Sequence, residues 1–328
     1  MISRRQLRIK TLQTLYAYYN SEDAKVSNAE KELLFNINKA YDLYHSMFIL
    51  LIEIANYAES RIDLARNKRI PSNEDLHPNT RFIDSKLIEQ FRNSEQLLRY
   101  VDAKKITWVN NPDLLKEFHQ LIIDDPVFLD FMSAEQVTFT DEIKLFTHIY
   151  TNIIYPNENL EQVLEEQSIY WNDDLEYMIS MVLKTLKRFK EDQSEKYPLL
   201  DLYKNPDARE VPEDKEFAIE LLRKSILHRD EYIEYIKSNT KNWDLERIAF
   251  MDILIMQLAI TEFINFQSIP TKVTLNEYLE ISKIYSTSKS SVFINGVLDK
   301  IATQLRENNK IKKTGRGLIG ESDQHIEK

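Results

Sequence analysis

The chain has 328 residues, a formal net charge of −10 at pH 7 and no cysteine. With 4 glycines and 9 prolines against 43% hydrophobic residues, the composition excludes a disordered chain and favours an all-α globular protein. The missing cysteines exclude disulfides, thiolate metal sites and a cysteine nucleophile. The sequence shows no signal-peptide pattern and no apolar run long enough to span a membrane, so we expect a cytoplasmic protein without membrane contact.

The first predicted helix covers residues 3–19, where apolar side chains recur at three- and four-residue steps and Ser3 can act as the N-cap. Its first turns carry four cations: Arg4, Arg5, Arg8 and Lys10. Cations at a helix N-terminus oppose the helix dipole and cost about 0.3–1 kcal/mol each at low salt, so helix stability does not explain them. From the residues alone, this stretch is either a solubilising charge run or a phosphate-binding arm.

Charge is distributed unevenly along the chain. Residues 1–20 carry +4, residues 21–204 carry −12 and residues 205–328 carry −2. The middle segment would repel a polyanion, while the two ends could accept one.

After a short linker, a stripe of apolar residues without proline or glycine predicts one long helix over 28–67. A polar loop with two prolines follows, and shorter helices are predicted over 83–106, 111–121, 127–133, 139–154 and 158–192. Three prolines within 196–214 indicate a domain boundary.

Beyond this boundary, residues 217–236 form an amphipathic pattern, and residues 242–266 are hydrophobic nearly all round, as expected of a central core helix. Thr274 and Glu277 have the spacing of a capping box and predict a helix start there. The last helix is predicted over 289–307. It contains Gly296, which predicts close packing by another group because glycine is unfavourable in a helix interior.

Two C-terminal stretches carry a family resemblance. Residues 269–285, IPTKVTLNEYLEISKIY, and residues 288–301, SKSSVFINGVLDKI, resemble the C-terminal signature of the NusB family of bacterial transcription antitermination factors. The opening RRQLRIKTLQTLY resembles the N-terminal pattern of the same family. The resemblance covers about 1–20 and 205–306 and implies a NusB-like all-α helical bundle with an additional helical insertion.

The resemblance implies a division of the chain into four parts. Residues 1–20 are expected to be the first helix of the NusB-like domain and its arginine-rich RNA arm, and residues 205–307 to be the remaining helices. Residues 21–204 are expected to be an acidic helical insertion, and residues 308–328 a flexible basic tail.

The resemblance also implies a function without catalysis or cofactor. Family members pair with the ribosomal protein that acts as NusE, bind boxA elements of nascent rRNA transcripts and act in the RNA polymerase antitermination complex. The residues that match the RNA-binding positions, or lie beside them, are Arg4, Arg5, Arg8, Lys10, Lys289, Ser290 and Phe293. Phe293 has an alternative interpretation as a core residue. Lys289 departs from an acidic residue frequent in the family, which leaves the NusE contact there open.

Other interpretations are weaker. A protein-only scaffold of the transcription or ribosome-assembly machinery is the main alternative, because the insertion is acidic and could dock proteins. An RNA methyltransferase, in which a similar domain occurs, is disfavoured by the missing glycine-rich βαβ segment and cysteine. Gly315, Gly317 and Gly320 match a dinucleotide-binding spacing by chance, and the scattered histidines predict no metal site.

Overall fold

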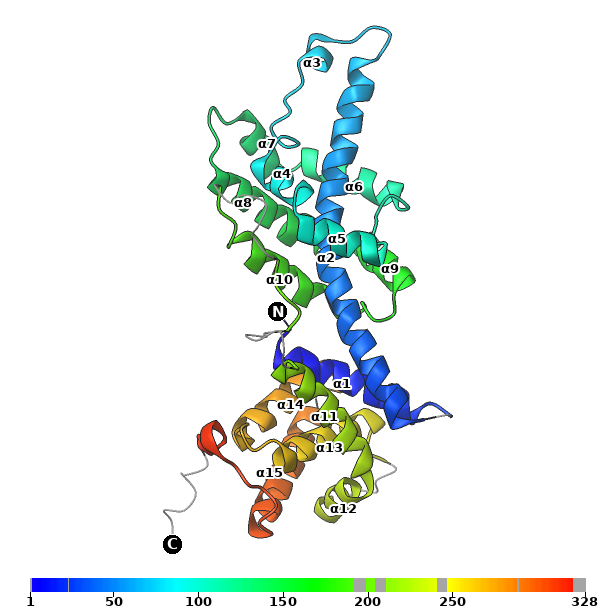
Figure 1. Cartoon of the computed structure of the whole chain (residues 1–328), viewed down its shortest axis with the longest axis vertical. Coiled ribbons are helices and arrows are strands. Elements are labelled where there is room, and N and C mark those ends of the chain that lie inside the picture. The colour runs from blue at the N-terminus through cyan, green and yellow to red at the C-terminus, as the bar shows by residue number, and fades with distance from the viewer. Residues whose placement is uncertain are drawn as a thin grey trace. The chain divides into compact units, whose positions relative to one another are not determined.

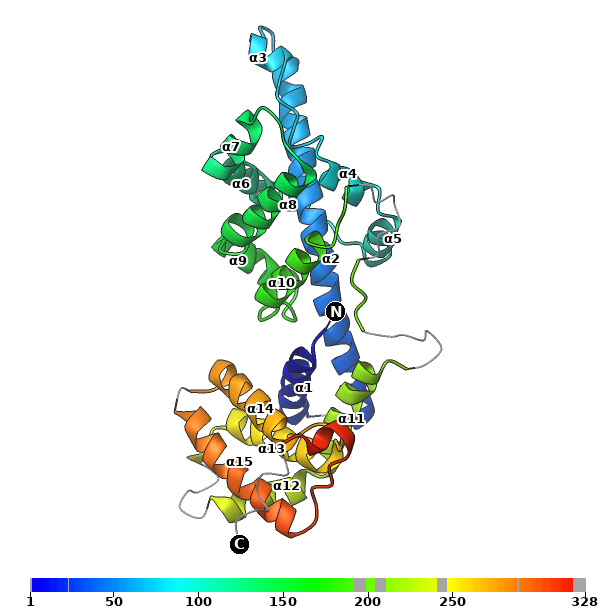
Figure 2. The same cartoon turned by 90° about the vertical axis from the view of Figure 1, so that its left-hand side faces the viewer.

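The computed structural model describes residues 2–22, 24–191, 199–203, 211–240, 247–287 and 289–320. These residues form helices and no strand, which confirms the predicted all-α class (Figures 1 and 2). The chain divides into two compact units. Unit 1 contains residues 38–202, and unit 2 contains residues 2–37 together with the chain from 203 onward.

The first two helices match their predicted extents closely. Helix α1 covers Arg4–Tyr19, and its N-cap Ser3 accepts a hydrogen bond from the backbone N–H of Gln6 at 3.2 Å, as predicted. Helix α2 runs without a break over Val26–Arg66, which confirms a single long helix. Its residues up to 37 belong to unit 2 and the rest to unit 1.

Unit 1 adds a series of short helices to α2. They are α3 (Asn73–Leu76), α4 (Lys86–Arg92), α5 (Glu95–Lys104), α6 (Pro112–Ile123), α7 (Pro126–Ser133), α8 (Phe139–His148), the π-helical turn η1 (Ile149–Ile154), α9 (Glu158–Gln167) and α10 (Leu175–Leu186). Buried aromatic side chains join them to α2. The indole N–H of Trp108 donates to the Ser46 carbonyl and the hydroxyl of Tyr150 to the Met47 carbonyl, each at 2.9 Å. Both polar atoms are thereby satisfied inside the core.

Two predicted helices of unit 1 are each split in two. The segment 83–106 contains α4 and α5, because Ser94 leaves the helical path and its hydroxyl caps α5 by accepting from the N–H of Leu97. The segment 158–192 contains α9 and α10, separated by residues 168–174. Both predictions of a single helix were wrong. In the first segment the reason is Ser94, because apolar periodicity alone does not register a serine that can end one helix and cap the next.

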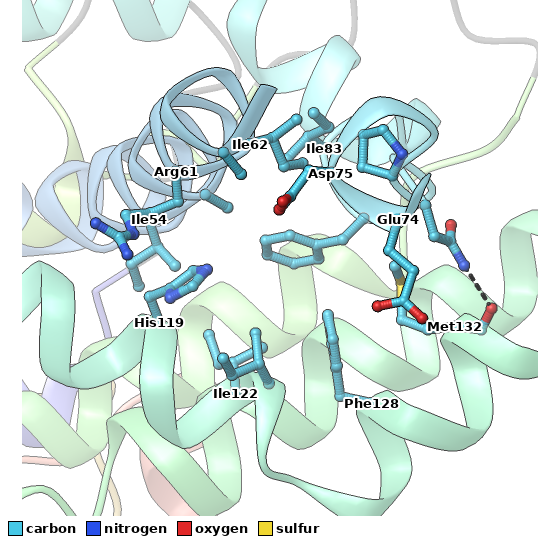
Figure 3. A pocket seen from close by; sticks show the side chains of 16 residues that line it. Ile54, Arg61, Ile62, Glu74, Asp75, Ile83, His119, Ile122, Phe128 and Met132 are labelled. Carbon is cyan, nitrogen blue, oxygen red and sulfur yellow. Dashed lines mark hydrogen bonds between the residues drawn. The ribbon is translucent and has the colours of Figure 1, made fainter. Parts of the chain in front are cut away.

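Unit 1 also contains a partly open pocket of about 350 Å³ between α2, the 74–83 segment, α6 and α7 (Figure 3). Its lining is mainly apolar, and two of its polar side chains serve the local structure. The carboxylate of Asp75 completes a capping box with Ser72, and the amide of Asn79 donates to the Met132 carbonyl at 2.8 Å.

Unit 2 is built around one buried helix. Its further helices are α11 (Glu213–Leu227), α12 (Arg229–Asn239), α13 (Phe250–Asn265), α14 (Thr271–Tyr285), α15 (Ser290–Glu307) and the 3-10 turn η3 (Gly315–Leu318). Every residue of α13 from Asp252 to Phe263 is buried, and α13 contacts α1, α11, α12, α14 and α15. This confirms the predicted central core helix.

The predicted capping box is wrong. Helix α14 begins at Thr271, directly after Pro270, so Thr274 and Glu277 lie inside the helix. The hydroxyl of Thr274 donates to the carboxylate of Glu262 at 2.7 Å instead of capping the backbone. Proline suits the start of a helix because it lacks the N–H that would be left unsatisfied there.

The structure also differs from the prediction for the C-terminal segment. Residues 308–320, expected to belong to a flexible tail, lie against unit 2. The backbone N–H of Thr314 donates to the carbonyl of Gln267 at 3.0 Å, and Gly317 is buried. Residues 321–328 lie outside the described residues.

Gly296 does not fill the role that its sequence context predicts. It is exposed, and a Cβ built there meets nothing within 4 Å, so no neighbour requires a glycine. Replacing Gly296 with alanine is therefore expected to raise the free energy of unfolding by about 0.5–1 kcal/mol, because alanine restricts the unfolded chain and favours the helix. Urea denaturation followed by circular dichroism measures this change. An unchanged or lower stability would contradict it.

Candidate nucleic-acid interface

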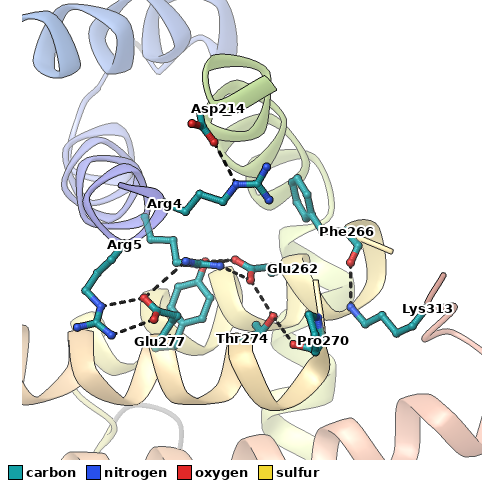
Figure 4. A network of polar contacts seen from close by, with 11 residues as sticks. Arg4, Arg5, Asp214, Glu262, Phe266, Pro270, Thr274, Glu277 and Lys313 are labelled. Atoms are coloured by element: carbon teal, nitrogen blue, oxygen red, sulfur yellow. Dashed lines mark hydrogen bonds and ion pairs between the residues drawn. The ribbon is translucent and has the colours of Figure 1, made fainter. Parts of the chain in front are cut away.

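The arginine cluster, defined as Arg4, Arg5 and Arg8, lies where α1 meets α11, α13 and α14 (Figure 4). Its innermost member is Arg8. The guanidinium of Arg8 donates from Nε and Nη2 to the two carboxylate oxygens of Glu262 at 2.8 and 2.7 Å. Both side chains are buried, at 3% and 0% exposed. This is a bidentate ion pair between the first helix and the central helix.

The carboxylate of Glu262 has further donors. Thr274 donates to one oxygen at 2.7 Å, and the hydroxyl of Tyr278 donates to the other at 3.3 Å. Burial alone would lower the pKa of Arg8, but the hydrogen bonds and charge of Glu262 outweigh it and raise the pKa of the guanidinium. The pair is therefore charged and saturated with hydrogen bonds, as a buried ion pair must be to persist.

The two outer arginines are also paired, but at the surface. The guanidinium of Arg5 binds both oxygens of Glu277 at 2.8 and 2.9 Å, and its hydrogen bond is the main cause that lowers the pKa of that carboxyl. Arg4 pairs with Asp214 at 3.1 Å and with Glu213. Arg4 and Arg5 keep 32% and 47% of their side-chain surface exposed, so both can exchange a carboxylate for another anion.

Two of the predicted RNA contacts are inconsistent with this geometry. Arg8 is 3% exposed and Lys10 is 0% exposed, so neither side chain can reach a phosphate in this conformation. The physical reason is the docking of α1, which packs against α11 and α13 and turns these positions inward. We therefore assign Arg8 a structural role.

The remaining predicted residues lie at the start of α15. Lys289 is exposed, Ser290 is buried with its hydroxyl 2.9 Å from that of Thr287, and Phe293 is half-buried. They follow the end of α14, where Tyr285 accepts a hydrogen bond from Gln13 of α1 at 3.1 Å. This contact lies in the third turn of α1, whereas the arginine cluster occupies the first two turns.

The sequence interpretation missed the acidic partners Glu213, Asp214, Glu262 and Glu277. A signal for one of them was available. Glu262 interrupts a helix that is otherwise hydrophobic nearly all round, and a buried carboxylate in such a helix needs a cation or several hydrogen-bond donors. The other three acids lie in ordinary polar sequence and carry no such signal.

The described residues form neither a metal-binding cluster nor a membrane-spanning helix. Among them, no three acidic or histidine side chains gather in a way that could hold a metal ion. In the same part of the chain, no helix combines the length and apolar character needed to cross a membrane.

Fold and site together define an all-α protein whose arginine-bearing first helix docks on a buried carboxylate of a central helix. The NusB family model matches residues 176–303. The transcription antitermination protein NusB of Salinibacter ruber is 36% identical over 139 residues, which cover 42% of this chain and 87% of that protein. The chain belongs to the NusB family of transcription antitermination factors, as its motifs predicted. This family is not enzymatic, which confirms the expectation of a non-catalytic protein.

Other relatives match shorter parts. The NusB proteins of Chloroherpeton thalassium and Natranaerobius thermophilus are 35% and 45% identical over 116 and 74 residues. These matches cover 33% and 23% of this chain, and 55% and 53% of the two relatives, so the chain spans about half of each. No solved structure matches the chain.

Proposed function

We propose that this protein binds boxA-type RNA of nascent rRNA transcripts together with the ribosomal protein that acts as NusE, within the RNA polymerase antitermination complex in the cytoplasm. The observation that carries the proposal is the match to a curated NusB protein over 87% of that protein's length. The acidic block 21–204 is proposed to be an insertion in the NusB-like domain. The family model begins at residue 176, within that block.

The RNA contacts are proposed to come from the exposed cations of the predicted set. Arg4 and Arg5 keep accessible side chains, and Lys289 is exposed beside the half-buried ring of Phe293. A protein that binds single-stranded RNA needs cations to contact the phosphates and flat side chains on which the bases can stack. Arg8 supports Arg4 and Arg5 from within the protein, because its buried pair with Glu262 fixes the first turns of α1, and Lys10 is buried.

Replacing Arg4 and Arg5 with alanine is expected to weaken binding of boxA-like RNA and to reduce the slope of log K against log salt by about 1.4, because about 0.7 is lost per single-strand phosphate contact. The slope is measured by fluorescence anisotropy of labelled RNA at several salt concentrations from about 50 to about 300 mM, a range that includes physiological ionic strength. The matched control removes two exposed cations of unit 1, Arg99 and Lys105, and is expected to leave the slope unchanged.

A second variant is expected to change RNA affinity in the opposite direction. Glu277 holds Arg5 through two hydrogen bonds, so Glu277→Gln frees a cation without adding one and is expected to tighten RNA binding. If neither the arginine variants nor Glu277→Gln changes RNA affinity, the arginine cluster is not part of the RNA interface.

The alternative function is a protein-only scaffold that has lost RNA binding. It is favoured by one specific observation: each arginine of the cluster is already paired with a carboxylate of unit 2. A gel-shift with boxA-like RNA, with and without the NusE partner, separates the two functions. A scaffold would bind the protein partner and leave the RNA unshifted.

A further inference from the structure

The basic segment, residues 308–320, has the sequence NNKIKKTGRGLIG, with four cations and no acidic residue. It is held in place by backbone contacts. The N–H of Thr314 donates to the Gln267 carbonyl at 3.0 Å. The Nζ of Lys313 donates to the Phe266 carbonyl, also at 3.0 Å (Figure 4). The segment therefore lies along the connector between α13 and α14.

Glycine is required for this contact at one position. A Cβ at Gly317 would lie 1.9 Å from the backbone oxygen of Gln267, closer than any side chain tolerates. At the other end of the segment, the side chain of Lys272 lies beside Gly320, where its Cδ would be 3.4 Å from a built Cβ. Lys272 belongs to the first turn of α14, so the C-terminal end of the segment, at Gly320, lies against a cation of that helix.

The cations of the basic segment and Lys272 differ in their interaction partners. Lys310 pairs with Glu231 at 3.4 Å, and Lys313 donates to a backbone carbonyl. The other three form the basic patch: Lys272, Lys312 and Arg316. All three are exposed, and none has a carboxylate partner within the described parts of the chain.

The basic patch differs from the arginine cluster in that its cations have no carboxylate partners among the described residues. Residues 1–10 and residues 308–320 each contain four basic side chains and no acid. The three arginines of the first stretch are neutralised by four carboxylates of unit 2, and the fourth cation, Lys10, is buried. The basic patch keeps its charge at the surface. A polyanion that approaches unit 2 gains from the patch without displacing a carboxylate.

We propose that the basic patch is a second contact for the phosphate backbone of single-stranded RNA, in addition to the contacts of the arginine cluster; this inference rests on the proposed function. Unpaired exposed cations release counterions when they bind phosphates, which gives affinity without base specificity. The contact at Gly317 pre-organises the segment, so fewer chain conformations are lost on binding. The patch thus extends the RNA path to the connector between α13 and α14.

The first test uses the full chain with Lys272, Lys312 and Arg316 replaced by alanine. Loss of three phosphate contacts is expected to reduce the salt slope of boxA-like RNA binding by about 2 and the affinity at 0.1 M salt by about 10- to 100-fold. The matched control replaces three exposed cations of unit 1, Arg99, Lys105 and Lys144, and removes the same charge. It is expected to bind RNA like the parent chain.

A second variant keeps every charge. Gly317→Ala places a methyl group against the Gln267 carbonyl and is expected to detach the segment and lower RNA affinity several-fold, with an unchanged circular dichroism spectrum. If Gly317→Ala binds RNA with the affinity of the parent chain, the inference that a pre-organised segment contributes to RNA binding is wrong.

The outcomes distinguish the two proposals. If the parent chain fails to bind RNA with and without the NusE partner, the proposed function and this inference both fail. If the parent binds RNA and the triple variant binds equally well with the same slope, the basic patch alone is overturned. If the triple variant keeps RNA binding but loses an acidic protein partner, the patch is a protein contact and the RNA assignment is wrong.

Discussion

Glu262→Gln is expected to lower the free energy of unfolding of unit 2 by about 3–5 kcal/mol, the range seen when one partner of a buried ion pair is removed. Glutamine keeps the shape of the side chain but removes its charge. The guanidinium of Arg8, 3% exposed, would then remain charged in the interior without a counter-charge at hydrogen-bond distance. The nearest other carboxylate, that of Glu277, lies 3.6 Å from Nη1 and is already engaged by Arg5.

The amide also disturbs two neighbours. Thr274 and Tyr278 both donate to the carboxylate of Glu262, and an amide offers a single acceptor oxygen in place of two. One buried hydroxyl therefore loses its acceptor, which adds to the cost. Hydrogen exchange of the α13 and α14 amides measures the stability of unit 2 separately from that of unit 1, which a single denaturation curve would merge.

Two further variants test whether the lost stability comes from the unpaired charge of Arg8. Glu213→Gln removes an acid from the same network, but its side chain is 81% exposed, so little change is expected. The double variant Arg8→Met with Glu262→Leu removes both charges and is expected to recover part of the lost stability. The desolvation cost disappears with the pair, but the hydroxyls of Thr274 and Tyr278 lose their acceptor. Equal protection in Glu262→Gln and the parent chain would show that the pair does not stabilise unit 2.

The burial of Arg8 was partly predictable from the sequence. Arg8 lies four residues before Leu12 and seven before Leu15, so it shares the apolar face of α1 with them, and both leucines are fully buried. A different pattern, hydrophobic residues nearly all round the helix, identifies α13 as the central helix. A cation on an apolar helix face predicts a buried partner. The spacing alone does not separate Arg8 from Arg5, which lies seven residues before Leu12 and is exposed.

The identity of the partners was beyond sequence reasoning. Arg8 and Glu262 are separated by 254 positions and Arg5 and Glu277 by 272, so no local spacing connects them. The capping-box pattern at Thr274 shows the same limit. Its local spacing is correct for a helix start, but Pro270 starts the helix earlier and the two side chains serve tertiary contacts instead.

Unit 1 is expected to lose stability as the pH falls from about 6.5 to about 4, because burial lowers the pKa of His45 to about 4. In this window the unfolded chain binds a proton at this histidine and the folded chain does not, so the free energy of unfolding decreases with decreasing pH. A shift from 6.5 to about 4 corresponds to a loss of about 3 kcal/mol in total.

The surroundings of His45 explain why the folded state excludes the proton. The ring is fully buried, with Nδ1 2.9 Å from the carbonyl of Tyr41 and its face stacked on Tyr100 at 3.9 Å between ring centroids. Nε2 has no hydrogen-bond partner among the described residues, so a proton there would add a buried, unsatisfied donor. Asp42 opposes the shift, but its carboxylate already accepts a hydrogen bond from the Tyr100 hydroxyl at 2.6 Å.

His119 of unit 1 adds a contribution of the same sign, because burial and the charge of Arg61 lower its pKa as well. His45→Phe separates the two histidines, since it keeps an aromatic ring at position 45 and removes the titration. The variant is expected to flatten the pH dependence of urea denaturation between pH 6.5 and 4, followed by the fluorescence of the buried Trp108 and Trp171. His77→Phe makes the same exchange at an exposed position of unit 1 and is expected to keep the slope of the parent. A slope that survives in His45→Phe would mean that His45 is not the group whose protonation opposes folding.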